Sequence, residues 1–119
     1  MTRGPAAATP EEYLAAAPAD QALALRTVLG RLLDALPGAQ TVISYGIIVV
    51  RVDGRAFVGL SAARTHCSLH LMSTVAASSL AEVLPEGRLV GATVHFSADA
   101  PLGPATVRTI VEARRHVLD

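Results

Sequence analysis

The segment Val42–Leu71, VISYGIIVVRVDGRAFVGLSAARTHCSLHL, is the part of the chain that decides its fold. Two runs rich in β-branched residues meet at Asp53-Gly54. An Asp-Gly pair between such runs is typical of a two-residue type I′ hairpin turn. A third run with alternating side chains follows, so the segment predicts three consecutive antiparallel strands with helical sequence before and after it.

The hairpin turn also predicts a register. With a two-residue turn, the opposing residues are Val52 with Arg55, Val50 with Phe57, and Ile48 with Gly59. One face then carries Ile48, Val50, Val52 and Phe57, and the other carries Ile47, Val49, Val58, Leu60 and Ala62. Because both sets are largely apolar, we expect another segment of the chain or a second copy to cover the second face. The net charge of zero does not oppose association, so we expect a homodimer.

Two further runs alternate between apolar and polar side chains. In the run 65–71, one side carries Cys67, Leu69 and Leu71, and the other carries His66, Ser68 and His70. In the run 92–96, one side carries Ala92, Val94 and Phe96, and the other carries Thr93 and His95. Both patterns predict strands with one buried face and one polar face.

Helix signals lie on both sides of these strands. Thr9 can cap a helix that begins at Pro10, and Glu12 completes a capping box, while Pro18 keeps this helix short. Further helices are expected over about residues 20–36, from Ser73 or Thr74 to Leu84, and from Gly103-Pro104 onward. We therefore expect an α+β fold, an antiparallel β-sheet of four to five strands packed by N-terminal and C-terminal helices.

Length and composition set the outer limits. The 119 residues predict one domain over residues 9–119, preceded by a flexible N-terminal tail over residues 1–8. A formal net charge of zero gives no global field for nucleic acid or an anionic membrane, so neither is expected as a partner. Cys67 is the single cysteine, and no apolar run reaches the roughly 18 residues of a membrane helix, which together predict a cytoplasmic protein.

The order and spacing of several short motifs resemble those of the YdhG-like family, also known as domain of unknown function 1801. The matching stretches are Tyr13-Leu14, Leu36-Pro37, Ile43-Ser44-Tyr45-Gly46, Asp53-Gly54, Ala62–His66, Gly91–Phe96, Pro101-Leu102 and Ile110–Arg114. The resemblance covers about residues 12–115. It implies a small antiparallel sheet packed by helices and, for some relatives, a frataxin-like iron-chaperone role.

The chain departs from the family pattern at positions that concern this role. Thr41 stands where the family usually has Glu, before the Ile-Ser-Tyr-Gly motif. Hard cations prefer oxygen ligands, and an iron chaperone is expected to carry a row of carboxylates. Here Glu11, Glu12, Asp20 and Asp34 are spread over separate positions and do not form an acidic ridge.

Histidines are the candidate metal ligands. His66 and His70 lie about 13 Å apart along one strand and cannot share an ion. His70 and His95 could meet if their strands are neighbours, so they form the candidate metal pair, although two imidazoles without a carboxylate or thiolate make a sparse site. Ordinary surface histidines are the alternative reading.

A small-ligand site is predicted around Tyr45, Arg64 and His66. Tyr45 offers a ring and a hydroxyl, and Gly46 permits close approach of a ligand or a sharp bend of the backbone. No catalytic residues are assigned, because Ser61 lacks a full nucleophile-elbow motif and Cys67 shares an apolar face. We expect a non-enzymatic module that binds a small ligand or a protein partner without a cofactor, with the iron or metal chaperone as the alternative.

Overall fold

The computed structural model describes residues 7–117 and contains helices and a single sheet. The helices are α1 (Pro10–Ala16), α2 (Ala19–Ala35), α3 (Thr74–Leu80) and α4 (Pro104–Arg115). The strands are β1 (Gln40–Ser44), β2 (Ile47–Val52), β3 (Arg55–Ala62), β4 (Cys67–His70), β5 (Arg88–Val90) and β6 (Thr93–Phe96). The predicted α+β fold is confirmed, whereas most of the predicted tail, residues 1–6, lies outside the described residues.

The sheet is antiparallel throughout and has the strand order β1-β2-β3-β4-β6-β5. Its six strands exceed the four to five expected from the sequence. The sequence does not predict β1 and β5 as separate strands, because β1 mixes polar and apolar residues and β5 is only three residues long. Both lie at the edges of the sheet, where few side chains are buried, so apolar and polar residues alternate least clearly along the strand.

Local capping signals explain the helix boundaries. The Thr9 hydroxyl accepts a hydrogen bond from the backbone N–H of Glu12, and the Glu12 carboxylate accepts one from the N–H of Ala8. The helix α1 ends at Ala16, in front of Pro18, as the sequence predicts. The α3 cap is Ser73, whose hydroxyl accepts from the N–H of Ala76. Within residues 7–117, no helix is long and apolar enough to cross a membrane.

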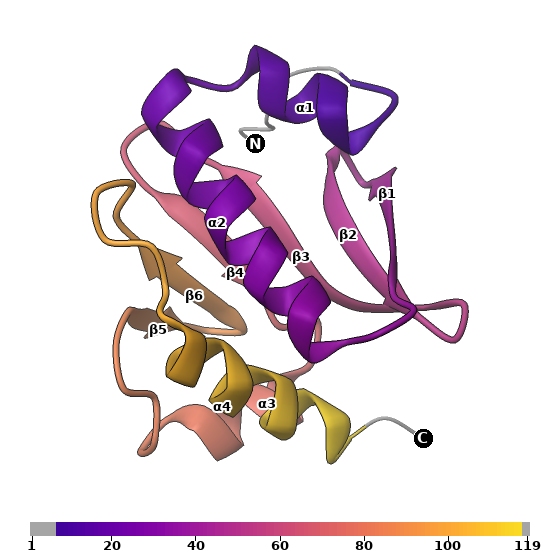
Figure 1. The fold of residues 1–119 in the computed structure, drawn as a ribbon. Coiled ribbons are helices and arrows are strands. Elements are labelled where there is room, and N and C mark those ends of the chain that lie inside the picture. The colour runs from indigo at the N-terminus through magenta and orange to yellow at the C-terminus, as the bar shows by residue number, and fades with distance from the viewer. Residues whose placement is uncertain (1–6, 118–119) are drawn as a thin grey trace.

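In Figure 1, α2 crosses in front of the sheet, α1 lies across its upper end, and α4 lies at its lower end with α3 beside it. The helices and the near side of the sheet share one apolar core. Its largest fully buried members are Tyr13, Phe57, Leu25, Leu32, Ile48, Leu60, Leu69, Leu71, Leu80, Leu102 and Ile110. The Tyr13 hydroxyl accepts a hydrogen bond from the N–H of Ala62, which ties α1 to the end of β3.

A β-bulge at Phe57 changes the hairpin register. Arg51 pairs with Ala56, but Val50 pairs with Val58, so Phe57 is the extra residue on β3. The predicted pairings of Val50 with Phe57 and of Ile48 with Gly59 are therefore wrong. Beyond the bulge, Ile48 pairs with Leu60 instead, and only the predicted pair Val52 with Arg55 is confirmed, because it lies on the turn side of the bulge.

The bulge gathers the hairpin's apolar side chains on the helix-covered side. Ile48, Val50, Phe57, Val58 and Leu60 all belong to the single core cluster, so the predicted division into two apolar faces is wrong. We call the opposite side the far face; its register positions include Val49, Gly59, Ser61, Ser68, His70, Thr93 and His95. The premise of two large apolar faces, on which the expected homodimer depended, is thereby removed.

A small apolar group remains on the far face. Val49 is buried but does not belong to the core cluster. It pairs with Gly59, over which the ends of Ile47 and Met72 lie, at 2.8 and 3.0 Å from where a Cβ atom would stand. The missing side chain of Gly59 thus leaves the room that these two side chains fill.

The turns between β1 and β2 and between β2 and β3 have the same geometry. Asp53 and Gly54 have φ values of 52° and 78°, which confirms the predicted type I′ turn. Tyr45 and Gly46, between β1 and β2, have φ values of 55° and 75°. The Tyr-Gly pair is therefore a hairpin turn of the same kind, and this role accounts for Gly46 without a ligand.

Arg114 connects α4 to the sheet through hydrogen bonds to β3 and to the residue after β4. Its Nε donates to the backbone carbonyls of Phe57 and Leu71 at 2.8 and 3.0 Å, and Nη2 donates to Ala56 at 3.3 Å. The guanidinium also lies 5.2 Å from the centroid of the Phe57 ring. The buried arginine thus satisfies carbonyls that the strand ladder leaves unpaired.

Candidate functional site

The three histidines singled out in the sequence lie close together on the far face. The rings of His66 and His95 are 4.4 Å apart between centroids and meet edge to face. His95 pairs with Ser68 and His70 pairs with Thr93, so His70 and His95 are diagonal neighbours on the adjacent strands β4 and β6. The condition for the candidate metal pair, that the strands of His70 and His95 are neighbours, is therefore met.

Hydroxyl groups surround these imidazoles. The Ser61 hydroxyl lies 2.8 Å from Nε2 of His70, and the Thr93 hydroxyl lies 3.5 Å from Nδ1 of the same ring. The Ser68 hydroxyl lies 3.4 Å from Nδ1 of His95. We call these six residues the histidine–hydroxyl row: Ser61, His66, Ser68, His70, Thr93 and His95. These hydroxyls contact both ring nitrogens of His70 and Nδ1 of His95, which are atoms that a metal ion would need.

Burial favours the neutral form of two of these rings. It lowers the pKa of His70, and the neighbouring His95 lowers it further. The pKa of His95 is likewise lowered, first by burial and then by His66 and Arg88. Neutral imidazoles can accept hydrogen bonds or bind metals. Among residues 7–117, however, no three His, Cys, Asp or Glu side chains are grouped to hold one ion.

The residues of the predicted small-ligand site do not share one cavity. Tyr45 is 88% exposed at the tip of the β1–β2 turn. Arg64 lies in the β3–β4 turn and lines a cleft of about 450 Å³ to which neither Tyr45 nor His66 contributes. His66 instead contacts His95 in the histidine–hydroxyl row.

Cys67 and Ser61 differ in what surrounds them. Burial, with a smaller effect of Asp20, raises the pKa of the Cys67 thiol to about 11, so this thiol is protonated at neutral pH. It therefore matches the expected inert, buried cysteine. Ser61 has a histidine partner, but it lies within β3 rather than in a strand-to-helix turn.

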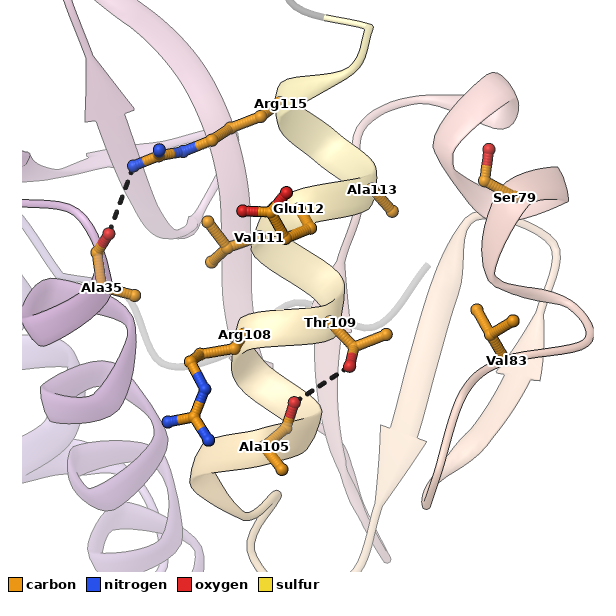
Figure 2. A pocket seen from close by; sticks show the side chains of 10 residues that line it. All are labelled: Ala35, Ser79, Val83, Ala105, Arg108, Thr109, Val111, Glu112, Ala113 and Arg115. Atoms are coloured by element: carbon orange, nitrogen blue, oxygen red, sulfur yellow. Dashed lines mark hydrogen bonds between the residues drawn. The ribbon is translucent and has the colours of Figure 1, made fainter.

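A groove with a volume of about 740 Å³ lies elsewhere, around α4 (Figure 2). The C-terminal end of α2 forms one wall, and α3 with the turn after it forms the other. The lining residues are Ala35, Ser79, Val83, Ala105, Arg108, Thr109, Val111, Glu112, Ala113 and Arg115. This volume is within the range of about 300–1,000 Å³ that is typical of small-ligand sites.

Charged groups border this mostly small-residue groove. Figure 2 shows Arg108 and Arg115 on the α2 side of α4, and Thr109 and Ala113 turned toward α3. Arg115 donates to the carbonyl of Ala35 at 3.3 Å, and the Thr109 hydroxyl donates to the carbonyl of Ala105 at 3.0 Å. Within the described part of the chain, the Arg108 guanidinium makes no hydrogen bond and no ion pair.

Sequence reasoning misses this groove. The C-terminal helix is recognised by its apolar stripe, which faces the core, whereas most of the α4 residues that line the groove lie off this stripe. The available signal is the spacing of Arg108, Glu112 and Arg115, which places charges along one exposed side. That spacing alone does not reveal that α2 and α3 rise on both sides to form walls.

Comparison with known proteins supports the fold. No protein-family model matches the chain, and no curated protein matches it. The structure is similar to the crystal structure of a DUF1801 family protein, YdhG, from Bacillus subtilis, with a TM-score of 0.75. The two chains are 16% identical, and the similarity covers 86% of this chain and 84% of that one. The chain therefore has the YdhG-like fold that its sequence motifs resemble.

Proposed function

We propose that the domain is a non-enzymatic binding module that holds a small anionic molecule with an apolar body in the groove around α4. The observation that carries this proposal is the unpaired guanidinium of Arg108 at the edge of a groove of about 740 Å³. An arginine presents several N–H donors in a planar fork that matches a carboxylate or a phosphate. Val83, Val111 and the alanines offer apolar surface beside it.

The charge pattern favours an acid over a neutral ligand. Arg108 and Arg115 stand against the single carboxylate of Glu112 in the groove wall. Glu112 lies 4.0 Å from Nε2 of His116, one turn further along α4, and this pair is exposed. A ligand carboxylate would add the partner that Arg108 lacks, while its apolar part would cover Val83 and Ala105.

Calorimetric titration with short aliphatic and aromatic carboxylates, each compared with its primary amide, tests the proposal. The carboxylates are expected to bind at least about tenfold more tightly, because charged hydrogen bonds contribute about 1.5–3 kcal/mol. Arg108→Gln should remove this preference, and Ala105→Leu, which fills the groove, should weaken both ligands. Arg55→Gln, at an exposed hairpin position, is the matched control. Equal affinity for acids and amides, unchanged by Arg108→Gln, would contradict the proposal.

The metal chaperone is the second candidate, favoured by the gathering of His66, His70 and His95 on one face. Calorimetric titration with ferrous iron or zinc at neutral pH separates it from the first. Stoichiometric micromolar binding that is lost in His70→Ala and His95→Ala would support the chaperone. Retained metal affinity in both variants would assign the ion to other groups.

Self-association through the far face is a separate proposal. Val42 and Ile47 are partly exposed there and form the apolar side of β1 and β2 that the helices do not cover. Light scattering at micromolar concentration should then give a dimer mass, and Ile47→Glu should convert it to a monomer. A monomer mass for the unaltered chain would refute this arrangement.

A further inference from the structure

We propose a second binding site, independent of the groove around α4, for a small zwitterionic molecule of the amino-acid type. The site is the cleft of about 450 Å³ at the start of α2. Its walls are formed by α2, the β3–β4 turn and the segment after β6. The lining residues that matter here are Asp20, Gln21, Arg64, Thr65, Ser97 and Asp99.

Gln21 carries the strongest indication of a missing partner. Its side chain is 5% exposed, and its Nε2 donates to the carbonyls of Ala63 at 2.8 Å and His66 at 3.5 Å. Because both of these partners are acceptors, the amide orientation is fixed, and Oε1 is the group that points away from them. This oxygen is buried and has no hydrogen-bond partner among the described residues. Gln21 lines the cleft, so a ligand donor at this wall is the partner that we assign to the oxygen.

Two carboxylates accompany this acceptor. Asp20 comes from the first turn of α2, and its Oδ1 accepts from the N–H of Gln21 at 2.8 Å. Asp99 follows β6 and accepts from the Ser97 hydroxyl. Each carboxylate retains a second oxygen for another donor. An ammonium group, with three N–H donors, matches the combination of Gln21 Oε1 and these acids.

Arg64 supplies the opposite charge from the other wall. It lies in the β3–β4 turn, in which the carbonyls of Ala63 and His66 accept hydrogen bonds from Gln21. Within residues 7–117, Arg64 makes no hydrogen bond or ion pair. A guanidinium pairs with a carboxylate. A ligand with both an ammonium and a carboxylate group therefore satisfies both walls, whereas a simple amine or a simple acid satisfies only one. The cleft and the α4 groove share no lining residue.

Amide chemical-shift titration with free L-amino acids, each compared with its N-acetyl and its C-terminal amide form, tests the inference. The free forms should shift the backbone signals of Gln21, Arg64 and Thr65 with a dissociation constant of about 1 mM or tighter. Both capped forms should bind at least about tenfold more weakly, which corresponds to the loss of one charged contact. Arg64→Gln and Asp99→Asn should each weaken the free forms, and Arg55→Gln should not.

Several results would overturn the inference. Signals that remain unmoved up to about 10 mM ligand, equal effects of free and capped forms, or unchanged binding by Arg64→Gln would each do so. A crystal structure grown with amino acid present, in which a lone water meets Gln21 Oε1, would also do so. Free amino acids that shift only residues of α4, as simple acids would, support the α4 groove and contradict this second site, so the two proposals fail separately.

Discussion

The two faces of the sheet differ in polarity although the same strands form both: one face is apolar and packs against the helices, and the other is largely polar. The covered face packs Ile48, Leu60, Leu69 and Val94 in a row across four strands, under α1, α2 and α4. The far face carries hydroxyls and imidazoles at the alternating positions of β3, β4 and β6. Beside Gly59 it keeps a small apolar group.

This difference depends on a single extra residue. Strict alternation through the Asp53-Gly54 hairpin would divide its apolar side chains between the faces, as the sequence predicts. The bulge at Phe57 shifts the alternation by one residue, and places Val50, Phe57 and Val58 on the covered side. A sheet whose sequence appears apolar on both sides can therefore have one core.

The largest effect is expected at the bulge itself. Phe57→Ala removes a fully buried ring from the covered face and should lower the free energy of unfolding by about 3–5 kcal/mol. Ile47→Ala, on the far face, should cost about 1 kcal/mol, because Ile47 is only partly buried. Urea unfolding measures both. Equal losses would contradict the division between the faces.

The next effect concerns the arginine that closes the covered face. Arg114→Met keeps much of the side-chain volume but leaves the Phe57 and Leu71 carbonyls without their donor, and should cost about 2–3 kcal/mol. The adjacent Arg115→Met is the control. Arg115 is exposed and makes one hydrogen bond to Ala35, so about 0.5 kcal/mol is expected. Thermal or urea unfolding that showed similar losses would remove the assigned role of Arg114.

The apolar group of the far face can be tested at Gly59. Gly59→Ala places a Cβ atom against the ends of Ile47 and Met72, which are flexible, so a loss of only about 1 kcal/mol is expected. Met72→Ala should relieve part of this loss when the two changes are combined. A double-mutant cycle of unfolding free energies measures the coupling, and strictly additive losses would show that Met72 does not lie over Gly59.

The polar part of the far face should respond to acid. The pKa values of His70 and His95 are lowered below the ordinary histidine value of 6.5, chiefly by burial. Below that pH the unfolded chain binds protons that the folded chain does not bind, so stability falls on acidification and is unaffected above it. Urea midpoints at about pH 7.5 and 5.5 should show this loss.

A matched pair of variants assigns the acid sensitivity. His70→Gln should reduce the difference between the two midpoints, because it removes one of the histidines that resist protonation. His116→Gln, at the exposed end of α4, should leave the difference as it is. An unchanged difference in His70→Gln would place the sensitivity outside the histidine–hydroxyl row.

The smallest effect is expected at Tyr45, outside both faces. This side chain is exposed, and its φ of 55° is better suited to Asn, Asp or Gly at the first position of a type I′ turn. Tyr45→Asn should therefore raise the free energy of unfolding by about 0.5 kcal/mol. Destabilisation instead would show that the ring packs on the far face in solution.

The fold was largely predictable because its signals are local. Asp53-Gly54, the cap at Thr9 and the alternation at Cys67, Leu69 and Leu71 each specify structure within a few residues. The bulge was not predictable, because no turn residue or glycine marks Phe57, and its position is set by packing against α4. The sequence predicted that His70 and His95 would be close only if their strands were neighbours, and the tertiary structure shows that they are.

The binding sites were less accessible to sequence reasoning. The groove around α4 needs walls from α2 and α3, and the four strands β1 to β4 lie between these two helices in the sequence. Arg64 was named, but its companions Gln21 and Asp99 come from segments far from it along the chain. No spacing rule connects residues that meet only through the packing of α2 against the β3–β4 turn.

The Phe57 bulge also constrains how this hairpin can change in length. Deleting one residue between Gly54 and Val58 would restore strict alternation, and would turn either Phe57 or its neighbours toward the far face. A one-residue insertion at the tip, usually tolerated in loops, would alter the phase of β3 relative to β2 in the same way. The turn at Asp53-Gly54 is exposed, yet its number of residues is restricted, because it fixes which side chains of β3 face the core. A graft or tag inserted at this turn should therefore preserve the register of β2 and β3.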